Sequence, residues 1–145
     1  MADATRAAAA FLDFVPQMMC NLRTGLAESG SGLSVAQFRT LKMVHHSSDV
    51  NLGDLADATG VSPPAMSKLV DGLVDAGLLE RRPAADDRRR VELSLTAAGR
   101  RRLEAVGDRL RAALAASLST FSASDLSILE RALRQLNETR PLVNA

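Results

Sequence analysis

The stretch GVSPPAMSKLVDGLVDAG, residues 60–77, decides how this chain folds. Ser62 is a favoured helix N-cap, and Pro63 follows at the first helical position, where its missing N–H is not needed. Gly77 is typical of the residue that ends a helix. Between them one apolar stripe recurs at helical spacing: Met66, Leu69, Val70, Leu73 and Val74. Since an apolar segment precedes the turn at residues 60–62, we expect two helices joined by a three-residue turn, a helix-turn-helix.

A short β-hairpin is expected directly after Gly77. The segment LLERR (residues 78–82) forms its first strand and PAADDRRR (residues 83–90) its turn. Alternating apolar and polar residues then predict the returning strand. Its inward face is predicted to consist of Val91, Leu93 and Leu95.

Three helices are predicted before the turn. Apolar residues at helical spacing over residues 11–26 predict the first, with Pro16 producing a kink or marking its proper start. Ser34 opens a capping box for a second helix that runs through about His46. The third is short and covers residues 52–59.

Two helices are predicted after the hairpin. Thr96 caps the first, whose 24 or so residues would give a length of about 36 Å. The second is capped by Ser122 or Ser124, and its leucines are spaced 3, 4 and 3 residues apart, as in a coiled-coil seam. The apolar stripe of the long helix consists of Leu103, Val106, Leu110, Leu114, Leu118 and Phe121. The leucines of the last helix are Leu126, Leu129, Leu133 and Leu136.

Composition restricts the class of protein. The 145 residues are enough for one domain, and 46% hydrophobic with 24% charged residues is typical of a soluble globular chain. No apolar run reaches the roughly 18–20 residues that cross a bilayer, and the N-terminus lacks the features of a signal peptide. We therefore expect a cytoplasmic protein without membrane contact. The single cysteine, Cys20, rules out an internal disulfide.

Positive charge is concentrated in the middle third of the chain. Residues 1–67 carry a net charge of −2, residues 68–102 carry +3, and residues 103–145 are neutral. Arginine outnumbers lysine 16 to 2, and arginine suits bidentate contacts with phosphate or guanine. Because the chain has no Trp or Tyr, a platform that stacks single-stranded bases is not expected.

The helix that begins at Pro63 is therefore predicted to enter the major groove of DNA with its first turn toward the base edges. Lys68 can reach a phosphate or guanine, and the prolines and alanine offer apolar contacts to thymine methyl groups. The predicted DNA-binding residues of this segment are Ser62, Pro63, Pro64, Ala65, Ser67 and Lys68.

The hairpin tip is predicted to lie beside this helix as a wing and to insert arginine into the minor groove. Asp87 is expected to hold Arg89 extended through a charge-assisted hydrogen bond, with Arg88 and Arg90 assisting. Arg81 and Arg82, at the base of the wing, are expected to pair with phosphates or acids rather than with bases.

Residues 52–99 resemble the winged helix-turn-helix of the MarR family of transcription regulators. The resemblance rests on LADATGVSPPAMSKLVDGLVDAGLLERR and DDRRRVELSLTAAG. The wing pattern of that family, Asp-x-Arg followed by Leu-Thr and a nearby glycine, is matched by Asp87, Arg89, Leu95, Thr96 and Gly99. The lengths and order of the flanking helices also fit.

This resemblance implies a mainly α fold with a small β-hairpin wing, in a single domain of residues 1–145. Residues 34–99 would form the DNA-binding lobe, and residues 5–28 and 100–145 the dimerisation helices. It further implies a homodimer on a palindromic operator, usually a repressor that a small ligand or oxidant releases. A phenolic or lipophilic effector is expected between the dimer helices and the lobe, near Phe14, Met18, Phe38, Met43 and His46.

Several alternatives remain open. The apolar stripes of the outer helices expose more apolar surface than a monomer tolerates, but they could instead close an internal bundle. A winged helix that binds proteins rather than DNA is the alternative function. An enzyme is not expected, because no nucleophile elbow, phosphate-binding glycine loop or HExxH motif occurs.

The sequence gives only weak support for two possible reactive sites. Cys20 could sense oxidants, but a lone cysteine among Met18, Met19 and Leu22 is more typical of a small buried hydrophobe. His45 and His46, with Asp49, could suggest a metal site. Adjacent histidines point in different directions on a helix, so no metal or cofactor is expected.

Overall fold

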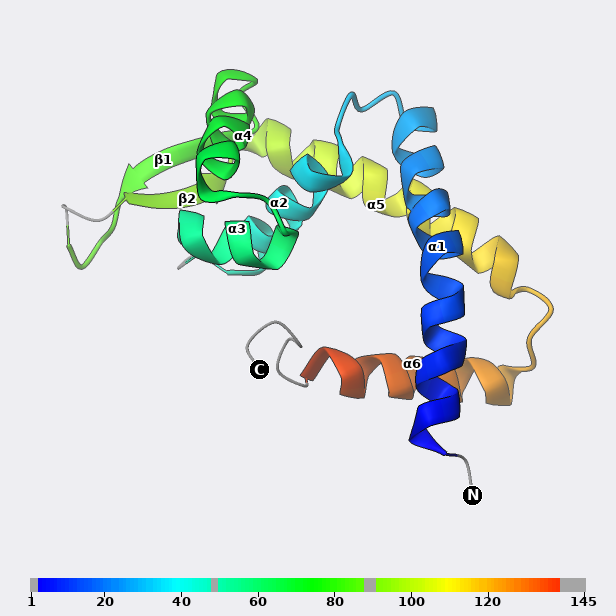
Figure 1. Ribbon diagram of the computed structural model, residues 1–145. Coiled ribbons are helices and arrows are strands. Elements are labelled where there is room, and N and C mark those ends of the chain that lie inside the picture. Colours follow the sequence, from blue (N-terminus) through cyan, green and yellow to red (C-terminus); the bar gives the residue numbers. More distant parts are fainter. Residues whose placement is uncertain (1–2, 48–49, 88–90, 139–145) are drawn as a thin grey trace.

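The computed structural model describes residues 3–47, 50–87 and 91–138. These residues form six helices and one antiparallel hairpin, which confirms the predicted fold class (Figure 1). The elements are α1 (Ala4–Glu28), α2 (Val35–His46), α3 (Leu52–Thr59), α4 (Pro63–Asp75), β1 (Leu79–Pro83), β2 (Val91–Leu95), α5 (Ala97–Leu118) and α6 (Ala123–Glu138).

Local caps define most helix ends, as predicted. The Ser34 hydroxyl accepts from the Gln37 backbone N–H at 3.1 Å, and the Gln37 side chain accepts from the Ser34 N–H at 2.9 Å. Ser62 caps α4, and Gly77 takes the left-handed conformation (φ 71°) after it. Of the two caps predicted for α6, Ser122 and Ser124, the structure has Ser122, whose hydroxyl accepts from the Asp125 N–H.

The core lies where α2, α3 and α4 pack against the hairpin and the first half of α5. Its most buried large side chains include Leu41, Leu55, Met66, Leu73 and Leu79. In Figure 1 the wing extends from this lobe, while α1, the second half of α5 and α6 lie apart from it. Helix α1 fully buries only Leu26 and packs mainly on α5, while α6 buries nothing among its described residues and follows α5 along the chain.

Of the two alternatives for Pro16, the one in which the first helix starts near it is wrong. The helix begins at Ala4, well before Pro16, which lies inside it. The Asp3 carboxylate accepts from the Thr5 N–H at 3.0 Å and caps the helix. The alanine run over residues 7–10 has the highest helix propensity, and a proline removes only one backbone hydrogen bond.

Three single-residue predictions are also wrong. Val91 is 57% exposed although Leu93 and Leu95 are buried, because it pairs with Pro83 at the outer end of the hairpin, beyond the core. Phe121 lies past the end of α5 and is half exposed. Cys20 is exposed rather than buried, since α1 packs on the core only near its C-terminal end.

Candidate nucleic-acid interface

Helix α4 is anchored along one face and open along the other. Met66, Val70 and Leu73 are at most 1% exposed and fix the rotation of the helix on the core. The predicted DNA-facing residues lie at the opposite side or at the amino end. Of these, Ser62, Pro63, Pro64, Ala65 and Lys68 are exposed and Ser67 is half-buried. The amino end of α4 therefore presents its first turn and one cation to solvent.

Two side-chain hydrogen bonds reach carbonyls of α3, the helix that ends just before the turn into α4. Gly60 takes the left-handed conformation (φ 69°) that lets the chain reverse between α3 and α4. The Thr59 hydroxyl donates to the Leu55 carbonyl at 2.6 Å, and the Arg39 guanidinium donates to the Ala58 carbonyl at 2.5 Å. Sequence reasoning missed Arg39, because it lies on α2 and no local pattern pairs it with α3.

The base of the wing is joined to α4 by an ion pair. The Arg81 guanidinium, on β1, lies 2.6 Å from the Asp71 carboxylate on the exposed face of α4. Arg82 pairs with Glu80 at 2.7 Å. The prediction that both arginines pair with acids or phosphates is confirmed for acids. Asp71 was not predicted as a partner, although its position one turn after Lys68 places it on the exposed face of the same helix.

The wing tip is described only in part. Asp87 is exposed. Arg88, Arg89 and Arg90, the predicted minor-groove readers, lie outside the described residues, and so does the predicted contact between Asp87 and Arg89. The antiparallel register runs from Leu79 with Leu95 to Pro83 with Val91, and the outer ends of β1 and β2 point away from the lobe (Figure 1).

The five residues predicted to contact an effector differ in burial. Phe38 is 8% exposed and belongs to the core, and Met43 packs partly against that core. Phe14, Met18 and His46 are exposed. A cavity of about 440 Å³ lies elsewhere, between the loop before α3 and the wing strands, where Arg81 and Leu93 line it.

No metal site is formed by the part of the chain that the structure describes, since no three His, Cys, Asp or Glu side chains there are grouped to hold an ion. The His45 and His46 rings pack edge to face with centroids 5.3 Å apart. Among the same residues no helix is long and apolar enough to span a membrane.

An anchored helix with an open amino end, a left-handed glycine turn before it and a hairpin attached beside it define a winged helix-turn-helix DNA-binding protein. A family model described as "MarR family" matches residues 31–90. The HTH-type transcriptional repressor Rv2887 of Mycobacterium tuberculosis is 34% identical over 113 residues, which cover 76% of this chain and 79% of that protein. The chain belongs to the MarR family and is a DNA-binding transcriptional regulator.

Other relatives agree with this assignment. The HTH-type transcriptional repressor YetL of Bacillus subtilis is 33% identical over 78 residues, which cover 52% of this chain and only 47% of YetL. The solved structure of Mycobacterium tuberculosis Rv2887 in complex with p-aminosalicylic acid has a TM-score of 0.75 and 25% identity, and covers 94% of this chain and 100% of that chain. These findings do not favour the alternative of a winged helix that binds only proteins.

Proposed function

We propose that this chain acts as a homodimeric repressor that binds a palindromic operator and is released by a small molecule. Helix α4 enters the major groove of each half-site, and the wing arginines Arg88–Arg90 reach the adjacent minor groove. Residues 34–99 act as the DNA-binding lobe, and residues 5–28 and 100–145 as the dimerisation helices. Relatives such as Rv2887 are named transcriptional repressors, which supports the repressor role.

The main support for DNA binding is that α4 has one packed face and one exposed face. Met66, Val70 and Leu73 are fully packed, so the helix cannot roll without breaking the core. Lys68 and the first turn consequently keep one orientation toward a groove. The ion pair between Arg81 and Asp71 supports the same mode, because it ties the strand that leads to the wing to the helix that reads bases.

The dimer is supported by apolar side chains that no described element covers. They lie on α1, on the second half of α5 and beyond it, and along α6, away from α4 and the wing. They include Phe11, Leu12, Phe14, Leu114, Phe121, Ile128 and Leu133. A soluble chain rarely leaves so many large apolar groups open. A two-fold dimer would set the two α4 helices about 34 Å apart, one turn of DNA.

The effector is proposed to be a small phenolic or lipophilic molecule bound between the dimerisation helices and the lobe. Phe14, Met18, Phe38, Met43 and His46 remain the proposed contacts. The p-aminosalicylic acid complex of Rv2887 supports this class of ligand. Binding of operator DNA implies that the protein works in the cytoplasm, next to the chromosome.

The deciding experiment is an electrophoretic shift of the DNA upstream of the gene over a salt series. Wild type is compared with Arg89→Ala and with Arg111→Ala, which removes an exposed guanidinium paired with Asp108 on α5. Wild type and Arg111→Ala should bind tightly and lose affinity steeply with salt, because neutralised phosphates release counterions. Arg89→Ala should bind at least tenfold more weakly, since an arginine bound in a narrow minor groove contributes strongly.

If the upstream DNA is not bound, selection from fragmented genomic DNA replaces it as the ligand. An enriched palindrome with half-sites one helical turn apart supports the proposal. Selection that enriches no sequence, or binding that is insensitive to salt, shows that the proposal is wrong.

A further inference from the structure

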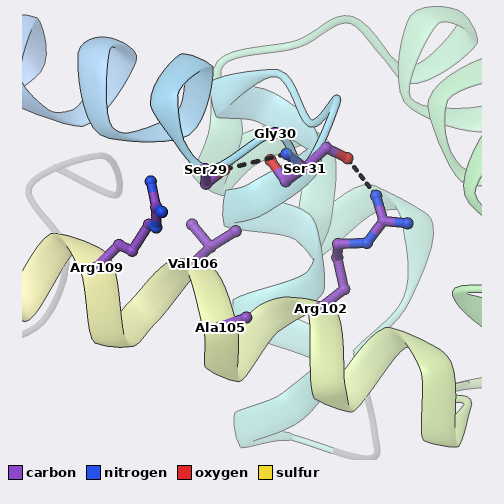
Figure 2. A pocket seen from close by; sticks show the side chains of 7 residues that line it. All are labelled: Ser29, Gly30, Ser31, Arg102, Ala105, Val106 and Arg109. Carbon is purple, nitrogen blue, oxygen red and sulfur yellow. Dashed lines mark hydrogen bonds between the residues drawn. The ribbon is translucent and has the colours of Figure 1, made fainter.

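A second cavity, of about 260 Å³, lies where the end of α1 meets α5. Figure 2 shows the loop Ser29–Ser31 on one side and four side chains of α5 on the other. Arg102 and Arg109 stand at its two ends, with Ala105 and Val106 between them. None of the residues proposed above to contact DNA or the effector lines this cavity.

Both arginines are held in place by backbone carbonyls. Arg102 donates through one terminal nitrogen to the Ser31 carbonyl, and Arg109 donates to the Glu28 carbonyl at 2.6 Å. Those carbonyls belong to the last turn of α1 and to the loop that follows it, where the helix leaves acceptors unpaired. Since a guanidinium has five N–H donors, each arginine keeps most of its hydrogen-bonding capacity.

The charge of this cavity is not balanced by the residues that form it. Neither Arg102 nor Arg109 makes an ion pair with any residue that the structure describes, and no lining residue is acidic. The hydroxyl oxygens of Ser29 and Ser31 accept from the Ser31 and Leu33 backbone N–H groups, and the arginines donate to carbonyls rather than to these hydroxyls. Two cations therefore share one small cavity without an anion.

Spacing along α5 sets the length of an anion that would fit. Arg102 and Arg109 are seven residues apart, which is two helical turns, so their side chains leave the same face about 10 Å apart at the backbone. Val106 is almost fully buried at the floor between them, and Ala105 presents only a methyl group. The cavity thus combines a positive charge at each end with an apolar centre.

We propose that this cavity binds a short aliphatic dicarboxylate. Each carboxylate accepts two parallel N–H bonds from one guanidinium, the geometry that arginine favours, and the methylene groups lie over Val106. A monocarboxylate of equal length leaves one arginine without an anion. The site is distinct from the effector site proposed above, and its binding does not depend on DNA recognition.

Calorimetric titration of the full chain with succinate tests the site, with chloride used to hold ionic strength constant. Succinate should bind once per chain. Butyrate, which has the same carbon chain with one carboxylate, should bind at least about tenfold more weakly, because a charge-assisted pair is lost. No DNA is present, so failure of this titration is separate from failure of the operator experiment.

Matched variants separate the site from a general charge effect. Arg102→Gln and Arg109→Gln should each weaken succinate binding about tenfold or more. Arg101→Gln removes an exposed neighbouring charge that does not line the cavity, and it should bind like wild type. The proposal would be overturned if all three variants lost the same amount of affinity for succinate, or if wild type bound butyrate as tightly as succinate.

A further variant covers the case in which loss of an arginine loosens the loop. Ala105→Phe keeps both guanidinium groups and fills the space between them from an exposed position on α5. It should fold, with an unchanged circular dichroism spectrum, and lose succinate binding. A folded Ala105→Phe chain that binds succinate as tightly as wild type would also overturn the proposal, as would absence of binding to wild type.

Discussion

Replacement of Gly99 by alanine tests how α5 is seated on the hairpin. A Cβ atom at this position would lie 2.0 Å from the Leu78 carbonyl oxygen, 2.9 Å from its carbonyl carbon and 3.0 Å from a Leu95 methyl group. Real Cβ atoms essentially never come within 3.0 Å of such neighbours. The Leu78 backbone cannot retreat easily, since its N–H donates to the Leu73 carbonyl at 2.9 Å and its carbonyl accepts from the Thr96 N–H at 3.1 Å.

The expected magnitude follows from two opposing terms. Forcing a methyl group into a packed site costs about 3 kcal/mol at the upper end of the usual range. Alanine regains up to about 1 kcal/mol of helix propensity over glycine. Gly99→Ala should therefore lower the free energy of unfolding by about 2 kcal/mol. Gly72→Ala is the matched control, at an exposed position of α4 where a Cβ atom meets nothing within 4 Å. It should raise the free energy of unfolding by up to about 1 kcal/mol.

The two variants are compared by thermal melts followed by circular dichroism, at one protein concentration because association shifts the midpoint. The difference of about 3 kcal/mol corresponds to a gap of roughly 6–12 °C between their melting temperatures. If Gly99→Ala melts at or above the wild-type temperature, the close approach of α5 to Leu78 is wrong.

Three further outcomes are expected. Thr96→Ala should lower the free energy of unfolding by about 1–2 kcal/mol in urea titrations, because the Thr96 hydroxyl caps α5 and donates to the Gly77 carbonyl at 2.6 Å. A decrease in that free energy smaller than the experimental error would refute this role. The Arg81→Gln and Asp71→Asn double-mutant cycle should give a stability coupling of only about 0.2–1 kcal/mol, because both side chains are substantially exposed, and a coupling above about 2 kcal/mol would contradict this. Lys68→Ala should weaken binding to all duplexes alike and lower the salt slope by about one, and an unchanged slope would show that Lys68 touches no phosphate.

Features that depend on neighbours in sequence were predicted well. The caps at Ser34, Ser62 and Thr96 each bond a backbone N–H three residues later, so the residue types alone indicate them. The hairpin and the start of α5 follow from the same local chemistry. The alternative of a helix start near Pro16 was wrong, because the alanine run before it has high helix propensity and the helix continues through the proline.

Features that depend on distant residues were not predictable in the same way. Arg81 and Asp71 lie on different elements, and Arg102 contacts Ser31 across 71 residues of sequence. Val91 continues the alternation of β2, but exposure depends on how far the core extends along the hairpin. The cavity between Arg102 and Arg109 exists only because the end of α1 lies against α5, so the spacing of the two arginines alone does not reveal it.

The junction at Thr96 has a mechanical consequence. Its hydroxyl bonds the Gly77 carbonyl just after α4, its backbone follows the last residue of β2, and it caps α5. Helix α4, the wing and α5 therefore share one pivot at Thr96. With 22 residues α5 is about 33 Å long, so a tilt of roughly 5° at its far end swings that pivot by about 3 Å. In the proposed dimer a displacement of that size approaches the rise of one base pair, so a small adjustment among the outer helices would change which spacing of DNA half-sites the two lobes can bind together.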